Sequence, residues 1–216
     1  MKKEFLKRLI SSLILIPLIV FLIFNGSFFL NLFLLICLLI SCYEWHLMTK
    51  LKSYYFYGFI FLTFSFYSAY EINNLENNRN LFFIILLICI STDIGGYIFG
   101  NIFKGPKLTK ISPNKTYSGM VGGFMLSLST IYIFSNFSYN KVEFKFSLGL
   151  LLFTLTVSAI SQIGDITISY FKRKSGIKNT NNIIPGHGGL LDRIDGMIFA
   201  YPLSYLIFLT NLFIKF

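Results

Sequence analysis

The sequence predicts an all-α, polytopic integral membrane protein with about seven transmembrane helices. Hydrophobic residues make up 55% of the 216 residues and charged residues 13%, whereas soluble domains carry about 25% charged residues. The apolar residues form long blocks rather than the short alternating segments of a membrane β-barrel. Composition and patterning therefore exclude a soluble domain and favour a bundle of helices in a bilayer.

Seven apolar blocks divide the chain. Each is close to the roughly 20 residues that a helix needs to cross about 30 Å of hydrocarbon, once tilt is allowed for. The first follows a basic tail, lacks a small-residue cleavage site, and is expected to remain as an anchor. The blocks are 9–24, 28–43, 54–70, 81–100, 118–136, 147–164 and 194–214.

The basic residues predict one orientation for these spans. With the N-terminus inside, only four of the 19 Lys and Arg residues fall outside, and the other fifteen lie in the inner tail and loops. This bias is typical of cytoplasmic segments and supports a single crossing at the tyrosine-rich third block. It places the C-terminus outside. Because the charges sit at block edges, lipid headgroups explain the net charge of +10 better than nucleic acid.

Two carboxylates lie in or beside apolar blocks. Asp93 is well inside the fourth block, where a charge costs about 2.5–3.5 kcal/mol, so it is expected to face a partner or a polar cavity. Asp165 ends the sixth block, and a continuing helix would place Asp165, Ser169 and Lys172 on one face. The alternatives are a structural contact between helices and an ordinary helix end with snorkelling cations.

A second pair of carboxylates opens the seventh block. Asp192 and Asp195 are three residues apart with Arg193 between them, so they can point toward one place. Mg²⁺ is commonly bound by one or two carboxylates together with substrate phosphates. Asp165 with Asp192 or Asp195 could supply such a site from two helices. The alternative is helix capping, which explains one aspartate better than two.

Phosphate-binding features accompany these acids. The segment 101–123 holds four lysines, Lys115 among them, followed by Gly119, Gly122 and Gly123, which permit close helix contact. The PGHGG turn, 185–189, offers backbone donors and His187. The alternative for the lysine-rich segment is an ordinary basic inner loop, and the alternative for His187 is a solvated histidine.

Two further groups have simpler interpretations. An interfacial belt explains Glu44, Trp45 and His46, at the end of the second block, at least as well as function does. The three cysteines lie in apolar blocks and are expected to be small core residues rather than disulfides or metal ligands.

Taken together, the motifs resemble the phosphatidate cytidylyltransferase (CDP-diglyceride synthase) family over about 90–200, in a chain short for that family, so early helices are expected to be missing. DIGGYIFG, KISPNKTYSG and GDITIS resemble family segments and place Asp93, Lys115 and Asp165. The long family signature is matched by Ser169, Lys172, Arg173, Lys178, Pro185, His187, Gly188, Gly189, Asp192, Arg193 and Asp195.

Three positions depart from the family pattern. Asn114 stands where the family has Lys, Ser118 where it has Glu, and Asn179 where it has Asp. Each removes a formal charge, so an impaired enzyme is conceivable. We still expect an active one because Asp165, Asp192 and Asp195 all remain.

The resemblance implies a Mg²⁺-dependent nucleotidyltransferase of the bacterial inner membrane, which converts CTP and phosphatidic acid to CDP-diacylglycerol and pyrophosphate. It implies membrane anchoring by 1–80, a catalytic membrane domain over 81–216 with its site on the cytoplasmic side, and a homodimer. A monovalent cation is a second candidate cofactor. The expected metal ligands are Asp165, Asp192 and Asp195; the other catalytic residues His187, Lys172 and Arg173; and the substrate-binding residues Asp93, Lys115, Ser169, Lys178, Gly188, Gly189 and Arg193.

Other functions stay open at this point. A CTP-dependent lipid-alcohol (polyprenol) kinase would transfer the γ-phosphoryl group rather than the nucleotide. An ion-coupled transporter could use Asp93 and Asp165 as a relay, although the spans show no two matching halves. A non-catalytic membrane homologue is favoured only by the three departures.

Overall fold

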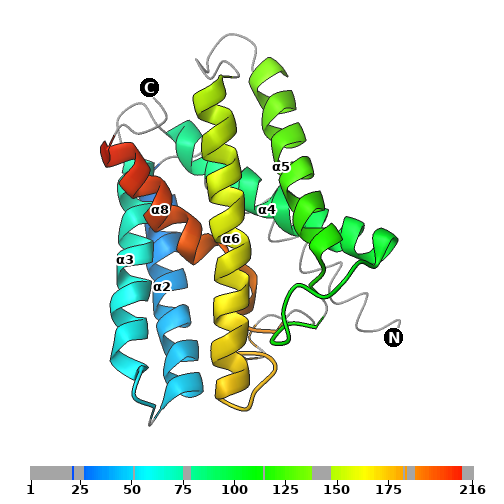
Figure 1. Cartoon of the computed structure of the whole chain (residues 1–216). Coiled ribbons are helices and arrows are strands. Elements are labelled where there is room, and N and C mark those ends of the chain that lie inside the picture. The colour runs from blue at the N-terminus through cyan, green and yellow to red at the C-terminus, as the bar shows by residue number, and fades with distance from the viewer. Residues whose placement is uncertain are drawn as a thin grey trace.

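The computed structural model describes residues 21, 27–50, 52–74, 79–113, 115–137, 147–181, 183 and 188–210. Every regular element of two or more residues in these ranges is helical, which confirms the all-α prediction (Figure 1). The helices are α2 (Ser27–Thr49), α3 (Tyr55–Asn74), α4 (Arg79–Phe103), α5 (Tyr117–Phe137), α6 (Leu148–Lys174), α7 (Leu191–Ile194) and α8 (Met197–Thr210).

Among the described helices, four are long and apolar enough to cross a membrane, in agreement with a polytopic membrane protein. They are Phe28–Thr49, Asn80–Phe103, Tyr117–Asn136 and Leu148–Lys174, which coincide with the second, fourth, fifth and sixth predicted blocks. The third block forms the 20-residue α3, and the described part of the seventh forms the 14-residue α8. The first block lies outside the described residues, so the number seven stays a prediction.

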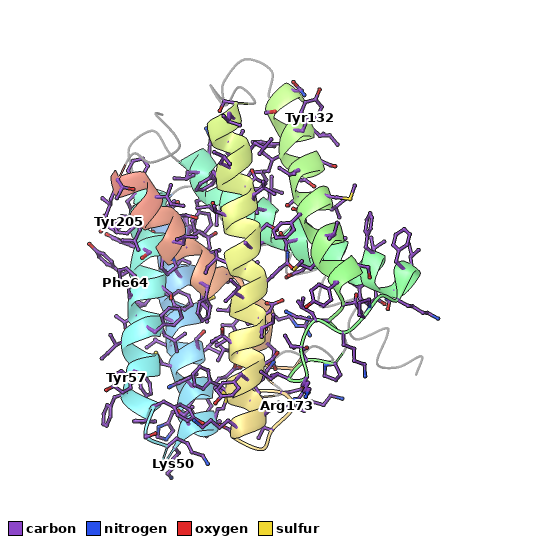
Figure 2. The ribbon with its side chains drawn as sticks, in the orientation of Figure 1. Lys50, Tyr57, Phe64, Tyr132, Arg173 and Tyr205 are labelled. Atoms are coloured by element: carbon purple, nitrogen blue, oxygen red, sulfur yellow. The ribbon has the colours of Figure 1, made fainter. Side chains whose placement is uncertain are left out.

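The outer surface of the bundle is strongly apolar. Phe28, Phe56, Tyr57 and Tyr97 are each more than 70% exposed. Figure 2 shows Tyr57 and Phe64 projecting outward from α3. Large apolar side chains on an outer face are stable against lipid but costly against water. The exposed apolar side chains of the helices therefore form the surface suited to contact the bilayer.

Glycines bring α4 and α5 into close contact. A Cβ atom on Gly95 would overlap the carbonyl oxygen of Gly122, and one on Gly119 would lie 2.7 Å from the Gly96 oxygen. Small residues let two backbones approach in this way, and van der Waals packing then holds membrane helices together. The close contact predicted from Gly119 and Gly122 is confirmed.

Helix α8 lies diagonally across α6 and α3 (Figure 1). Pro202 lies inside α8 and has no N–H to donate to the carbonyl of Ile198, four residues earlier. Ser65 of α3 donates its hydroxyl to that carbonyl oxygen at 2.6 Å. A side chain of α3 therefore replaces the missing helical hydrogen bond and ties α8 to the bundle.

The loops predicted to be basic and cytoplasmic lie at one end of the bundle. Figure 2 shows Lys50 and Arg173 at that end, with Tyr132 and Tyr205 toward the other. The turn between α2 and α3 approaches the end of α6, where the Tyr54 hydroxyl lies 3.3 Å from Ser175 Oγ. The shared position agrees with the charge pattern, while the side of the membrane stays a prediction.

Two adjacent glycines give a direct test of the α4–α5 packing. Gly95→Ala should lower stability in detergent by about 1–3 kcal/mol, because the new methyl group meets the backbone of Gly122. Gly96→Ala is the matched control, since its Cβ would have its nearest described neighbour at 3.8 Å. Thermal unfolding of both variants measures the difference. Equal unfolding temperatures for the two variants would contradict the packing described.

Candidate active site

The site begins where α6 ends. The Gly176 N–H donates to the Arg173 carbonyl and the Ile177 N–H to the Lys172 carbonyl, each at 3.0 Å. Gly176 has a φ of 75°, a left-handed conformation that glycine adopts without a steric cost and that commonly ends helices. The chain therefore reverses direction after α6 and brings Thr180 back beside α7.

Lys115 reaches α6 from the loop between α4 and α5. Its ammonium group lies 2.7 Å from Asp165 Oδ2. The two sides of this loop pair through their backbones. The Leu108 N–H donates to the Lys115 carbonyl at 2.7 Å, and Lys107 forms an antiparallel bridge with Thr116. The hydroxyl of Thr116 then accepts the Gly119 N–H at 3.1 Å and caps α5. The loop thus presents Lys115 to the sixth helix.

Asp165 also approaches Asp195, which lies between α7 and α8. The second oxygen of Asp165, Oδ1, is buried without a hydrogen-bond partner among the described residues. The carboxylates of Asp165 and Asp195 lie close enough for their charges to interact. A buried, unpaired oxygen beside a second carboxylate is a place where a bound cation would be favourable.

Glycines make this approach possible. A Cβ on Gly164 of α6 would lie 2.8 Å from the Asp195 carbonyl oxygen, and one on Gly196 would overlap Ser161 Oγ and lie 3.2 Å from Asp165 Oδ1. Asp93 of α4 is exposed and lies within electrostatic range of Asp165 and Lys115. Side chains from α4, from the loop before α5 and from the junction between α7 and α8 therefore gather around Asp165 on α6.

Asp192 has a different set of partners. Its Oδ1 lies 2.8 Å from Lys172 Nζ, and its Oδ2 accepts the Thr180 N–H at 2.9 Å and the Gly189 N–H at 3.1 Å. Burial tends to raise the pKa of Asp192, but these three donors outweigh it and hold the pKa below its usual value. Asp192 lies in the first turn of α7 but does not cap it, because the N-cap is Leu190, without a side-chain cap hydrogen bond. It pairs instead with Lys172, the cation expected on the same face of α6 as Asp165.

Glu44 is the residue that the sequence interpretation missed. Its side chain is fully buried. Oε1 accepts the Leu190 N–H, while Oε2 accepts the Leu191 N–H and the Thr180 hydroxyl, all at 2.8 Å. Trp45 is buried as well, at 4% exposure. An interfacial belt is therefore the wrong interpretation of Glu44 and Trp45, because both point into the protein.

The glycines of the PGHGG motif make room for these carboxylates. Gly188 has a φ of 91°, and a Cβ there would lie 2.9 Å from Asp192 Oδ2. A Cβ on Gly189 would overlap Thr180 Oγ1 and lie within 2.6–2.7 Å of both Glu44 oxygens. Only glycine fits at 189 while Glu44 and Thr180 keep these positions. Contact of Gly188 and Gly189 with substrate stays a prediction.

The other predicted residues that the structure describes lie on α6, directly after it, or on α7. Ser169 is half-buried on α6, between Asp165 and Lys172, while Lys178 and Arg193 are exposed. Arg173 is exposed and donates to the Ile177 carbonyl at 3.2 Å. His187 and Pro185 lie outside the described residues. The three cysteines are free, two of them buried and one half-buried, as expected of core residues.

Two of the departures from the family pattern are described by the structure. Ser118 Oγ accepts the Gly105 N–H at 3.3 Å and lies 3.0 Å from Thr116 Oγ1. Asn179 lies beside the Gly188 backbone. Ser118 thus has a structural role in the loop that carries Lys115. Asn114 lies outside the described residues.

A three-carboxylate metal site is not formed by the described side chains. Within the ranges that the structure covers, no three His, Cys, Asp or Glu side chains lie close enough to share one metal ion. Asp165 and Asp195 are together, whereas Asp192 is paired with Lys172. Two carboxylates are enough for Mg²⁺ when substrate phosphates supply other ligands.

Comparison with known proteins shows the family to which the chain belongs. Residues 52–211 match the sequence model of the Cytidylyltransferase family. A phosphatidate cytidylyltransferase of Rickettsia felis is 35% identical, with 95% of this chain and 93% of the relative aligned. A second, from Bacillus subtilis, is 37% identical over 71% of this chain and 56% of its own length. The short length is therefore shared with some relatives and not with others.

The match covers the helices α3 to α8 and every described residue of the site except Glu44. It includes both groups of side chains, the one around Asp165 and the one around Asp192. The chain therefore belongs to the cytidylyltransferase family.

Proposed function

We propose that this protein is a phosphatidate cytidylyltransferase. A phosphate oxygen of phosphatidic acid would attack the α-phosphorus of CTP, the bond to the β-phosphate would break, and pyrophosphate would leave with CDP-diacylglycerol as the lipid product. The observation that carries the proposal is convergence. Residues from distant segments form two groups, Asp93, Lys115 and Asp165 in one and Lys172 and Asp192 in the other, and Asp195 is within electrostatic range of both.

The residues fit the chemistry of phosphates in a membrane. The attacking group is already an oxyanion, so positioning and charge neutralisation are the main requirements. Lys115 and Lys172 are each held within 2.8 Å of a carboxylate oxygen, so their ammonium groups are fixed in place. Arg173, Lys178 and Arg193 are exposed at the same end and are assigned to the triphosphate or the lipid phosphate. His187 is assigned to phosphate contact.

Asp165 and Asp195 are the residues that would hold Mg²⁺. The support is the buried Asp165 Oδ1, which has no hydrogen-bond partner among the described residues, and the adjacent Asp195 carboxylate. A bound Mg²⁺ would supply positive charge against the phosphates of CTP. Asp192 as a third ligand stays a prediction, because the described donors already satisfy both of its oxygens. A monovalent cation also stays a prediction.

The position of the label distinguishes the proposed reaction from the nearest alternative. The purified protein in detergent would be incubated with Mg²⁺, phosphatidic acid and CTP labelled at either the α- or the γ-phosphorus. Nucleotidyl transfer is expected to carry the α label into the organic phase and release the γ label as pyrophosphate, in equal amounts.

Other label patterns would overturn the proposal. The γ label in lipid, with CDP in water and a polyprenol as acceptor, would establish the lipid-alcohol kinase. No transfer from either position by well-folded protein would favour the non-catalytic homologue. The transporter interpretation gives no role to the pairs at Lys115 and Lys172, and it predicts no transfer.

The metal assignment can be measured apart from turnover. Mn²⁺, as a spectroscopic stand-in for Mg²⁺, is expected to bind the parent protein, and Asp165→Asn should weaken binding about tenfold or more because one of two carboxylates is lost. Electron paramagnetic resonance of free Mn²⁺ provides the measurement. Glu71→Gln, on α3, is the control for loss of one charge.

Asp192→Asn in the same titration separates the two assignments. An unchanged affinity in Asp165→Asn together with a large loss in Asp192→Asn would move the metal to Asp192.

The proposed location is the bacterial inner membrane, with the site and the N-terminus in the cytoplasm, where CTP is. Lys50 and Arg173 at one end of the bundle support it. A reporter that is active only in the cytoplasm should be inactive when fused after Phe216, and activity there would reverse the topology.

A homodimer is also proposed from the family resemblance, and the mass of the detergent-solubilised protein by light scattering tests it.

A further inference from the structure

A buried carboxylate that precedes the matched family region holds the backbone of the candidate active site. Glu44 lies on α2, 136 residues from Thr180 and 147 from Leu191 along the chain. It nevertheless accepts one hydroxyl and two backbone N–H groups from the segment that contains the site. Its contacts are therefore tertiary and lie beside Asp192 rather than within its own helix.

Both oxygens of Glu44 act as hydrogen-bond acceptors. The three partners that the described residues supply are all donors. Burying a carboxylate is costly unless such hydrogen bonds compensate for the lost water. The Leu190 and Leu191 N–H groups are at the start of α7 and have no helical acceptor. Glu44 thus satisfies donors that the short helix leaves unpaired.

Thr180 connects Glu44 to Asp192. The Thr180 hydroxyl donates to Glu44 Oε2, and the Thr180 N–H donates to Asp192 Oδ2. The N–H groups of Gly189, Leu190 and Leu191 are then shared between the two carboxylates, the first with Asp192 and the others with Glu44. Glu44 and Asp192 therefore both bind Thr180, and between them they bind the backbone of residues 189–191.

Packing of α2 does not depend on Glu44 alone. Next to it, the Trp45 ring N–H donates to the Tyr55 carbonyl at 3.0 Å, and the Trp45 ring lies 5.4 Å from that of Phe171 on α6. A Cβ on Gly58 would overlap the same ring. These contacts attach α2 to α3 and α6 without the Glu44 carboxylate. Attachment of α2 therefore does not explain why Glu44 binds Thr180 and the start of α7.

We propose that Glu44 is a positioning residue for the nucleotidyl-transfer reaction. It acts through Thr180 and the Gly189–Leu191 backbone, and fixes Asp192 and its Lys172 partner relative to Asp165 and Asp195. This inference rests on the proposed function for its effect on turnover. The structural part, that Glu44 orders the turn, stands on the hydrogen bonds alone.

Glu44→Gln tests the inference by replacing one carboxylate oxygen with an NH2 group. The amide keeps the size of the side chain but turns one acceptor into a donor, so one backbone N–H loses its partner and faces another N–H group. Thr180→Val is the second variant, because it removes only the hydroxyl donor and leaves the Asp192 hydrogen bond. Thr180→Ser keeps the hydroxyl that Thr180→Val removes. Glu71→Gln is the control for charge elsewhere on the bundle.

Two measurements are made on each protein. The first is steady-state turnover of CTP and phosphatidic acid, in which Glu44→Gln should lower kcat about tenfold or more with a smaller change in KM for CTP. The second is hydrogen–deuterium exchange, in which peptides covering 180–192 should exchange faster while those of α3 and α4 stay unchanged. Thr180→Val should show a milder form of both, and Thr180→Ser and Glu71→Gln neither.

The outcomes separate this inference from the proposed function. We expect kcat to fall about tenfold or more in Glu44→Gln. A kcat within about twofold of the parent would contradict a positioning role for Glu44. Faster exchange spread over α3 and α4 would reduce Glu44 to a general packing role and overturn it as well. If the parent shows no turnover, the proposed function fails, and the exchange at 180–192 still decides whether Glu44 orders the turn.

Discussion

The geometry of the candidate active site depends on two carboxylates that bind the same backbone segments, at Thr180 and at residues 189–191. Glu44 and Asp192 together accept four N–H groups and one hydroxyl from Thr180 and residues 189–191. Without these acceptors the start of a four-residue helix would be left with unpaired donors in a buried place. Since Asp195 follows directly, the same contacts determine where it meets Asp165.

Glycines are the second constraint, because the polar groups meet only where backbones come close. Gly189 admits Glu44 and Thr180, while Gly164 and Gly196 admit the junction of α7 and α8 onto α6. On the other side, Gly95 and Gly122 join α4 to α5, and this pair holds the loop that delivers Lys115. Membrane packing and site geometry are thus achieved by the same kind of residue.

The helices and most charged residues of the site could be predicted from the sequence, because apolar length and local spacing carry that information. Spacing alone did not pair Lys115 with Asp165 or give Asp192 and Asp195 separate partners, since those contacts depend on how loops fold back. From the sequence, an interfacial belt explains Glu44 at least as well as function does, because its partners are more than 130 residues away. A carboxylate at a helix end has the same sequence pattern in both situations.

A double-mutant cycle on Glu44 and Thr180 tests the central claim most directly. Their side chains meet in a single hydrogen bond of 2.8 Å, and Thr180 keeps its separate link to Asp192 through the backbone. If the two residues act through this contact, adding Thr180→Val to Glu44→Gln should lower kcat little beyond Glu44→Gln alone. Losses that multiply would show independent action and would contradict the account of a turn held jointly by Glu44 and Asp192.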